Sequence, residues 1–189
     1  MAPSISTSRL LLRALGPNDA AAVFQYRSLP EVALYQGWAP ACADDACAFI
    51  DALAGTAPGT PGKWFQLGLE LRETGALIGD CGIQVTAADP RQAEIGITLA
   101  PAHQHRGLAL ETLRAVLGEL FGPWGMHRVF GSVDPRNTAS MTLLRRAGMR
   151  QEAHFVESYW SKDQWNDDVI FALLAREWTA SRPLENSTD

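Results

Sequence analysis

The stretch Gln104-His105-Arg106-Gly107-Leu108-Ala109 decides the fold prediction for this chain. It follows the apolar run Ile95-Gly96-Ile97-Thr98-Leu99 and precedes a segment in which leucine and valine recur at helical spacing as far as Leu120. The pattern predicts a strand, a short turn and the beginning of a helix. A helix N-terminus presents free backbone N–H groups and a partial positive charge, so we expect this turn to bind phosphate.

The turn differs from the two best-known phosphate-binding motifs. It lacks the glycine spacing of a Rossmann G-x-G-x-x-G and the G-K-[ST] end of a Walker P-loop. Gly107 and Ala109 are small, which lets a bulky diphosphate approach the backbone closely. We therefore predict a phosphate site of another kind, formed by the backbone amides from His105 to Ala109.

The bulk composition is that of an ordinary globular protein. The 189 residues suggest one domain, and the hydrophobic content of 47% lies in the usual range. No apolar run approaches the ~20 residues that are needed to cross a bilayer. The apolar run near the N-terminus is too short to be the core of a signal peptide. We therefore expect a cytoplasmic protein with no membrane partner. The net charge of −5 argues against a nucleic-acid partner.

The histidines and cysteines do not form a metal-binding pattern. The three cysteines include no C-x-x-C, and their odd number argues against a secreted disulfide framework. His103 and His105 fall in the phosphate turn, so we interpret them as solvated loop residues rather than zinc ligands. We expect no metal.

The remaining chain alternates strand and helix signals, which is typical of a mixed α/β domain. Strands are expected at 9–13, 64–71, 77–85, 94–99, 127–133, 151–156 and 169–175, and helices at 20–27, about 45–53, 108–121 and 138–147. We expect the polar segment 157–168 to join the last two strands. The boundaries predict a single domain over residues 1–178 and a polar, frayed tail over 179–189.

Several segments resemble, in their order and spacing, the GNAT superfamily of N-acetyltransferases, and within it the RimJ/RimL branch. The phosphate turn is similar to the Q/R-x-x-G-x-G/A signature with which that family binds the pyrophosphate of acetyl-CoA. The other matching segments are Arg9-Leu10-Leu11-Leu12-Arg13 with Asp19, Gly37-Trp38, Glu94-Ile95-Gly96, Asn137-Thr138-Ala139-Ser140 and Trp165-Asn166-Asp167. The resemblance implies a GNAT fold of the α/β (α+β) class. Its mixed central sheet has about seven strands, a splay between the two middle strands and helices on both faces.

The resemblance also implies how acetyl-CoA binds as co-substrate. The pyrophosphate meets Gln104, His105, Arg106, Gly107, Leu108 and Ala109. The amides of the pantetheine arm can hydrogen-bond to the strand backbone at Ile97 and Leu99, as an added strand would. Asn137 precedes a helix, so it can cap that helix, bond to the pantetheine arm, or do both.

The implied activity is transfer of the acetyl group to a primary amine by direct attack in a ternary complex. The acceptor is a protein N-terminal amine or an amine-bearing small molecule, and a homodimer is left open. Ser140 is the candidate acid for the departing thiolate, with a capping hydroxyl as its other role and Tyr159 as the competing acid. Glu94 and Glu157 are the candidate carboxylates. We favour Glu157 as the base and Glu94 as the substrate anchor.

Two further interpretations follow from the resemblance. Trp38 and Trp160 are candidates to line the acceptor pocket, while the other tryptophans are expected in packing roles. The alternative function is a catalytically silent acyl-CoA-binding sensor with the same fold. The joint presence of Ser140 and two candidate bases favours an enzyme.

Overall fold

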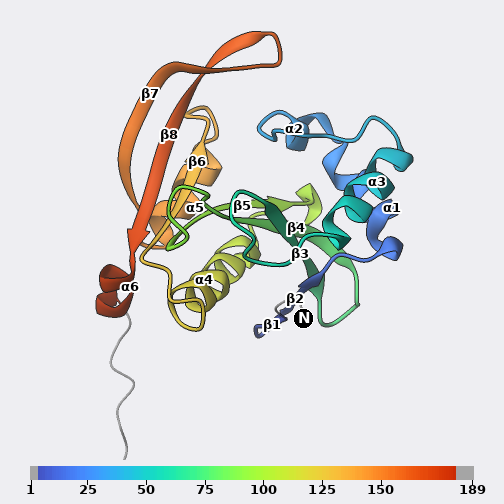
Figure 1. Ribbon diagram of the computed structural model, residues 1–189. Coiled ribbons are helices and arrows are strands. Elements are labelled where there is room, and N and C mark those ends of the chain that lie inside the picture. The colour runs from blue at the N-terminus through green and yellow to red at the C-terminus, as the bar shows by residue number, and fades with distance from the viewer. Residues whose placement is uncertain (1–3, 182–189) are drawn as a thin grey trace, which may run out of the picture.

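The computed structural model describes residues 4–181 and builds them on one mixed sheet of eight strands (Figure 1). The strands are β1 (Ile5–Ser6), β2 (Leu10–Ala14), β3 (Trp64–Leu71), β4 (Leu77–Val85), β5 (Gln92–Leu99), β6 (Arg128–Val133), β7 (Arg150–Ser161) and β8 (Gln164–Leu174). Their order across the sheet is β1-β2-β3-β4-β5-β6-β8-β7. Every neighbouring pair is antiparallel except β5 and β6, which are parallel.

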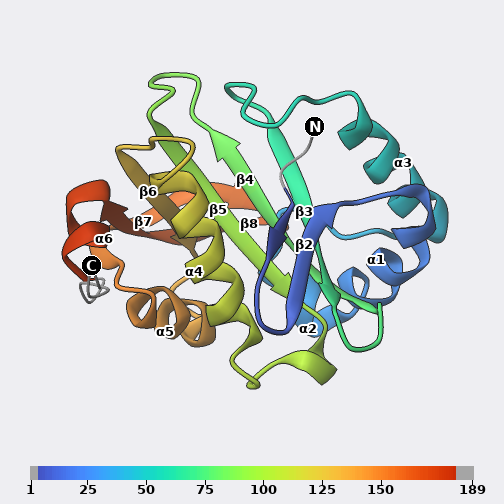
Figure 2. The same ribbon diagram turned by 90° about the horizontal axis from the view of Figure 1, so that it is seen from below.

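Helices cover both faces of this sheet, as expected. They are α1 (Ala20–Arg27), α2 (Pro30–Ala33), α3 (Ala43–Ala54), α4 (Leu108–Phe121), α5 (Thr138–Arg146) and α6 (Ala175–Ser181), with short 3₁₀ turns at Pro17–Asp19 and Pro101–His103. Figures 1 and 2 show α4 on one side of the sheet and α1 to α3 on the other. Within the described residues, no helix has the length and apolarity that spanning a membrane would require.

The side-chain alternation of β4 shows how the sequence separates the two faces. Cys81 and Ile83 are buried in the core that α4 covers, where Leu117 is also fully buried. Burying one such leucine contributes roughly 1.5–3 kcal/mol. The intervening residues, Asp80 and Gly82, point to the opposite face because successive side chains of a strand alternate. The face beneath α1 and α3 therefore carries polar and small residues, which leaves room for a site.

The two middle strands separate along their length, which confirms the predicted splay. β5 pairs with β6 at Gln92, Ala93 and Glu94, and the pairing ends there. On its other side β5 stays paired with β4 as far as Leu99. Residues 95–99 therefore have one backbone edge without a strand partner among the described residues. That edge can hydrogen-bond to an extended ligand.

The turn after β5 has the predicted strand, turn and helix arrangement. Gly107 is the N-cap of α4 and has a φ of 77°, while His105 has a φ of 58°. Left-handed backbone of this kind is easy for glycine and costly for most residues. The backbone conformation at position 107 therefore favours glycine by itself, apart from any need for a ligand to approach the backbone.

The prediction for residues 157–168 was wrong. This segment belongs to the long hairpin of β7 and β8, which pair up to Ser161 and Gln164. Its two-residue turn is Lys162-Asp163, with φ values of 53° and 58°, the backbone that a tight hairpin turn needs. Most of β7 is exposed, so the hairpin shows no apolar alternation, the signal by which strands are recognised.

The C-terminal boundary also differs from the prediction. β8 ends at Leu174, and α6 then runs from Ala175 to Ser181. Residues 179–181 of the expected tail are therefore helical. The remainder of that tail, 182–189, lies outside the described residues.

Candidate active site

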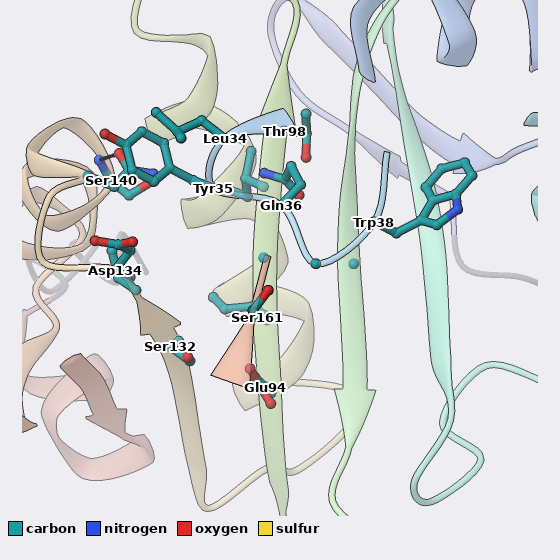
Figure 3. Close-up of a pocket in the computed structure, with 18 of the residues that line it drawn as sticks. Leu34, Tyr35, Gln36, Trp38, Glu94, Thr98, Ser132, Asp134, Ser140 and Ser161 are labelled. Carbon is teal, nitrogen blue, oxygen red and sulfur yellow. Dashed lines mark hydrogen bonds between the residues drawn. The ribbon is translucent and has the colours of Figure 1, made fainter. Parts of the chain in front are cut away.

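A cavity of about 570 Å³ opens at the splay, on the face of the sheet that carries α1 to α3 (Figure 3). This volume lies within the usual range for small-molecule sites. Strands β3 to β6 form its floor, and the chain between α2 and α3, the start of α5 and the tip of the β7–β8 hairpin form its walls. Residues from these elements that bear on its chemistry are Arg27, Tyr35, Trp38, Trp64, Gln66, Asp80, Glu94, Ser132, Asp134, Asn137, Ser140, Tyr159, Lys162 and Asn166.

The hairpin tip is fastened across one side of the cavity. The Lys162 ammonium donates hydrogen bonds of 2.6 Å to the backbone oxygens of both Ala33 and Leu34, at the end of α2. Figure 1 shows the tip of the hairpin reaching over toward α2. Because β7 and α2 are more than a hundred residues apart in the chain, this wall could not be anticipated from local sequence.

Asn166 holds the hairpin to the loop between β6 and α5. It is 7% exposed, and its amide donates to the backbone oxygens of Ser161 and Gln164 at 3.0 Å. Its side-chain oxygen accepts a 2.9 Å hydrogen bond from Nη2 of Arg136. A buried polar side chain with its hydrogen bonds satisfied fixes local geometry. Asn166 therefore positions the hairpin against the segment that carries Asn137.

The structure brings four of the predicted site residues together. Glu94, Ile97, Asn137 and Ser140 all line the cavity. Figure 3 places Glu94 and Thr98 along β5, and Ser140 across the splay, beyond the end of β6. Asn137 caps α5, because its side-chain oxygen accepts a 3.0 Å hydrogen bond from the backbone nitrogen of Ser140.

Glu94 is a half-buried carboxyl group at the end of the β5–β6 pairing. Burial raises the pKa of Glu94 above its usual value, and the negative charge of Asp168 adds to the effect. Asp168 is itself held by the Ser132 hydroxyl, which donates to its Oδ1 at 2.6 Å. A carboxylate with a raised pKa is a better proton acceptor near neutral pH than an ordinary one.

The structure does not bring Glu157 to the cavity. Its side chain is exposed, and it does not belong to the set that lines the cavity. Glu157 lies in a bulge of β7 with a φ of 47°, and its backbone nitrogen donates to Oδ1 of Asp167 at 2.9 Å. The bulge changes which way the strand's side chains point, and a bulge has no reliable sequence signal.

The two candidate proton donors both line the cavity. Burial raises the pKa of the Tyr159 phenol, and the carboxylates of Asp134 and Asp168 raise it further. This phenol therefore keeps its proton at neutral pH and can donate it. Ser140 has no such shift to consider, since a hydroxyl holds its proton throughout the physiological range.

The two tryptophans proposed for the acceptor pocket differ. Trp38 lines the cavity and stacks on Phe49, with ring centroids 4.5 Å apart. Trp160 lies outside the lining, is 58% exposed, and meets Trp165 edge to face at 5.7 Å.

A buried ion pair forms part of the cavity wall. Nε and Nη2 of Arg27 donate to the two carboxylate oxygens of Asp80 at 2.9 and 2.6 Å. The Tyr26 hydroxyl donates to Oδ2 of Asp80 at 2.5 Å. Both charged residues line the cavity, and Arg27 is only 6% exposed. No local sequence pattern indicates this pair, because α1 and β4 meet only in the folded chain.

The phosphate turn lies beyond the cavity, at the C-terminal end of β5. Its residues His105, Arg106 and Gly107 are exposed and do not line the cavity. The strand from Glu94 to Leu99 is roughly 17 Å long at the usual rise per residue. The cavity runs along β5 from Glu94 to Thr98, and the turn lies beyond the end of that strand. This arrangement fits a long ligand with phosphates at one end and a reactive group at the other.

The start of the chain braces the first turn of α4. Oε1 of Glu111 accepts hydrogen bonds from the hydroxyls of Thr7 and Ser8 and from the backbone nitrogen of Arg9, at 2.6, 3.0 and 2.9 Å. Oε2 of Glu111 accepts from Nε of Arg9 at 2.7 Å, and Arg9 also donates to the backbone oxygen of Arg106 at 2.9 Å. Burial opposes ionisation, but these bonds together lower the pKa of Glu111 to about 2.

No group of three or more histidine, cysteine, aspartate or glutamate side chains is placed to hold a metal ion within residues 4–181.

Comparisons with known proteins agree with this geometry. The family described as Acetyltransferase (GNAT) domain matches residues 9–150. The N-acetyltransferase YoaA of Bacillus subtilis (strain 168) is 34% identical over 176 residues, covering 92% of this chain and 98% of that protein. The ribosomal protein uS5-alanine N-acetyltransferase of Escherichia coli (strain K12) is 30% identical over 88 residues, covering 47% of this chain and 45% of that protein. The crystal structure of a GNAT-family acetyltransferase from Bacillus anthracis superposes with a TM-score of 0.83 at 25% identity, covering 92% and 99% of the two chains.

Proposed function

Because this chain belongs to the GNAT acetyltransferase family, we propose that it transfers the acetyl group of acetyl-CoA to a primary amine held beside Glu94. The observation that carries the proposal is the cavity at the splay. It joins a carboxylate of raised pKa, Glu94, with two possible proton donors, Ser140 and Tyr159.

The residues present fit acetyl-CoA, which supplies the activated acetyl thioester. The N-terminus of α4 offers backbone N–H groups and a partial positive charge to the pyrophosphate. The unpaired edge of β5 beside Ile97 offers hydrogen bonds to the amides of the pantetheine arm. Asn137 caps α5 and lines the same cavity, so it can reach the arm as well.

In the proposed mechanism, the chain's own residues move the protons. A free alkylammonium has a pKa near ~10, so it must lose a proton before it can attack. Glu94 accepts that proton, directly or through a water molecule. As the carbon–nitrogen bond forms and the carbon–sulfur bond breaks, Ser140 or Tyr159 gives a proton to the departing sulfur. The attacking nitrogen loses its second proton as the amide forms, and that proton restores the donor, directly or through water.

Direct transfer is preferred over an acyl-enzyme. The lining of the cavity contains neither cysteine nor histidine, so it has no activated thiol and no histidine base for a nucleophilic serine. Both substrates are therefore expected to occupy the cavity at the same time. An acid and a base in one cavity also favour an enzyme over a catalytically silent sensor.

For the acceptor, we propose a protein N-terminal amine first and a small-molecule amine as the alternative. The similarity to the ribosomal protein uS5-alanine N-acetyltransferase supports the first choice, although it covers about half of each chain.

The test compares Glu94→Gln with Glu157→Gln over a pH series. Wild-type kcat/KM should fall at low pH, because protonated Glu94 cannot accept a proton, and its raised pKa moves this fall to higher pH than an ordinary glutamate would. Glu94→Gln should lower kcat by roughly 10²–10⁴-fold and flatten the acidic limb. Glu157→Gln should keep the wild-type kcat and the acidic limb of the pH profile. A loss of kcat in Glu157→Gln and not in Glu94→Gln would identify Glu157 as the base.

A further inference from the structure

One row across the sheet forms a floor with almost no side chains. Gln66 on β3 is opposite Gly82 on β4, which is opposite Gly96 on β5. All three residues line the cavity. A Cβ built on Gly96 would have no atom within 4 Å, so the space above it is empty. The space above Gly82 is filled by the side chains of Gln66 and Trp64, so the hollow lies above Gly96, beside the side chain of Gln66.

The amide oxygen of Gln66 lies beside this hollow without a hydrogen-bond donor among the described residues. A Cβ on Gly82 would lie 2.8 Å from its Nε2 and 3.0 Å from its Oε1, so the amide rests directly over that glycine. Oε1 is buried and accepts no hydrogen bond from the described residues. A buried polar atom that lacks a partner costs free energy, unless a ligand supplies the missing bond.

A guanidinium nitrogen stands close to the same hollow. Asp80 precedes Gly82 by two residues on β4, so it shares the same face of the sheet and holds Arg27 there. Nε and Nη2 of Arg27 are engaged by Asp80, whereas Nη1 makes no hydrogen bond within the described part of the chain. The rings of Trp38 and Phe49 lie 5.7 and 5.6 Å from the guanidinium carbon and fix its orientation.

We propose that Gln66 and Arg27 bind a neutral amide group of the acceptor, above Gly96. The carbonyl oxygen of that amide accepts from Nη1 of Arg27, and its N–H donates to Oε1 of Gln66. A glutamine side chain offers both a donor and an acceptor, so either orientation of its amide pairs with a peptide-type group. The inference rests on the proposed function and names what the acceptor carries besides its amine.

The charges around the hollow favour a neutral group. The Arg27–Asp80 pair carries no net charge, so an added charged group gains little from it. A carboxylate would meet Arg27 already neutralised by Asp80, and it would also face the acidic group of Glu94. An amide supplies one acceptor and one donor without adding charge, which is what the unpaired atoms need.

The distance to the base sets which amide is recognised. Glu94 lies two residues before Gly96 on the same face of β5, which corresponds to about 7 Å along the strand. An amine held at Glu94 therefore brings its directly following amide to the hollow. The subsite formed by Gln66 and Arg27 therefore recognises the amide group next to the reacting nitrogen.

The test uses three acceptors with the same carbon skeleton: alanine amide, alanine methyl ester and alanine. The ester keeps the carbonyl but lacks the N–H, and alanine carries a carboxylate. We expect kcat/KM for the amide to exceed that for the ester and for alanine by about tenfold or more. Ligand-observed NMR without acetyl-CoA should show the same order of binding. Equal values for amide and ester in an active enzyme overturn the inference alone. Acetylation of none of several amines by folded protein overturns the proposed function, and the inference with it.

Matched variants locate the effect. Gln66→Leu should abolish the preference for amide over ester, mainly by raising KM for the amide. Gln84→Leu is the control, because Gln84 lies on the neighbouring strand outside the cavity lining and donates to the backbone oxygen of Gly62. Gly82→Ala is an independent variant, since its methyl group must push the Gln66 amide aside. A preference that persists in both Gln66→Leu and Gly82→Ala refutes the assignment.

Discussion

Replacing Gly107 by asparagine and, separately, by aspartate isolates the electrostatic part of cofactor binding. Both side chains tolerate left-handed backbone better than other residues, so the φ of 77° penalises the two variants alike. They have nearly the same shape and differ by one negative charge. A Cβ at this position would meet only Nη2 of Arg9, at 3.6 Å, so neither variant should disturb the packing.

The charge should act in opposite directions on folding and on binding. At the N-terminus of α4 a carboxylate stabilises the helix by roughly 0.3–1 kcal/mol. The same carboxylate at ~5 Å from a bound phosphate, with an effective dielectric constant of about 20, repels it by about 3 kcal/mol. Since about 1.4 kcal/mol changes a dissociation constant tenfold, Gly107→Asp should bind acetyl-CoA roughly a hundredfold more weakly than Gly107→Asn.

Calorimetric titration with acetyl-CoA measures this difference, and thermal unfolding provides the control. The gap in affinity should narrow as salt is raised from low ionic strength to about 0.5 M, because the charges are exposed and screened. Gly107→Asp should unfold at the same temperature as Gly107→Asn or higher. Equal affinity of the two variants at low salt would show that the pyrophosphate does not bind at this turn.

Three further predictions concern the acid, the brace of α4 and the buried ion pair. Ser140→Ala should lower kcat with little change in acetyl-CoA affinity, because proton donation to the sulfur matters mainly in the transition state. Steady-state kinetics that show full kcat in Ser140→Ala and a loss in Tyr159→Phe would assign the acid to the tyrosine. The pKa of Glu111 is about 2 in the folded protein and near ~4.3 in the unfolded chain, so its stabilising effect is complete above the higher value and lost as pH falls toward the lower. Urea unfolding at pH 7, 5 and 3 should therefore show Glu111→Gln destabilised at pH 7 and progressively closer to wild type at pH 3. Asp80→Asn should lose about 3–5 kcal/mol of unfolding free energy, because it leaves Arg27 buried without its counter-charge. Replacing both partners by apolar residues in the same urea assay should recover much of that loss.

The parts of the fold that were predictable depend on short-range patterns. The expected strands 64–71 and 77–85 coincide with β3 and β4, because apolar runs flank a turn in which Gly75 has a φ of 71°. The phosphate turn was recognisable because strand, glycine and amphipathic helix follow one another directly. Asn137 was identifiable as a cap for the same reason, since a cap depends on its nearest neighbours in sequence.

The parts that were not predictable depend on contacts between distant segments. The walls of the cavity depend on the hydrogen bonds of Lys162 to the end of α2 and on the pairing of Arg27 with Asp80, and neither contact has a local signal. The position of Glu157 was misjudged because one bulge in β7 redirects the side chains after it. The sequence does not show that Gly82 and Gly96 lie opposite each other, because that depends on the register between β4 and β5.

Two properties of this enzyme, cofactor binding and the shape of the cavity, depend on different segments of the chain, and the long β7–β8 hairpin contributes to the second. The strand edge and the turn expected to hold the cofactor come from one continuous stretch, from β5 into α4, whereas the hairpin, which supplies a wall of the cavity, follows only after β6 and α5. If the proposed acceptor site is right, insertions, deletions or exchanged hairpins between Tyr159 and Asn166 should alter which amine is accepted while the β5–α4 stretch keeps its sequence. This makes the hairpin the natural unit for recombination between relatives. Libraries that exchange only this segment should diversify acceptor choice faster than libraries that mutate the whole chain.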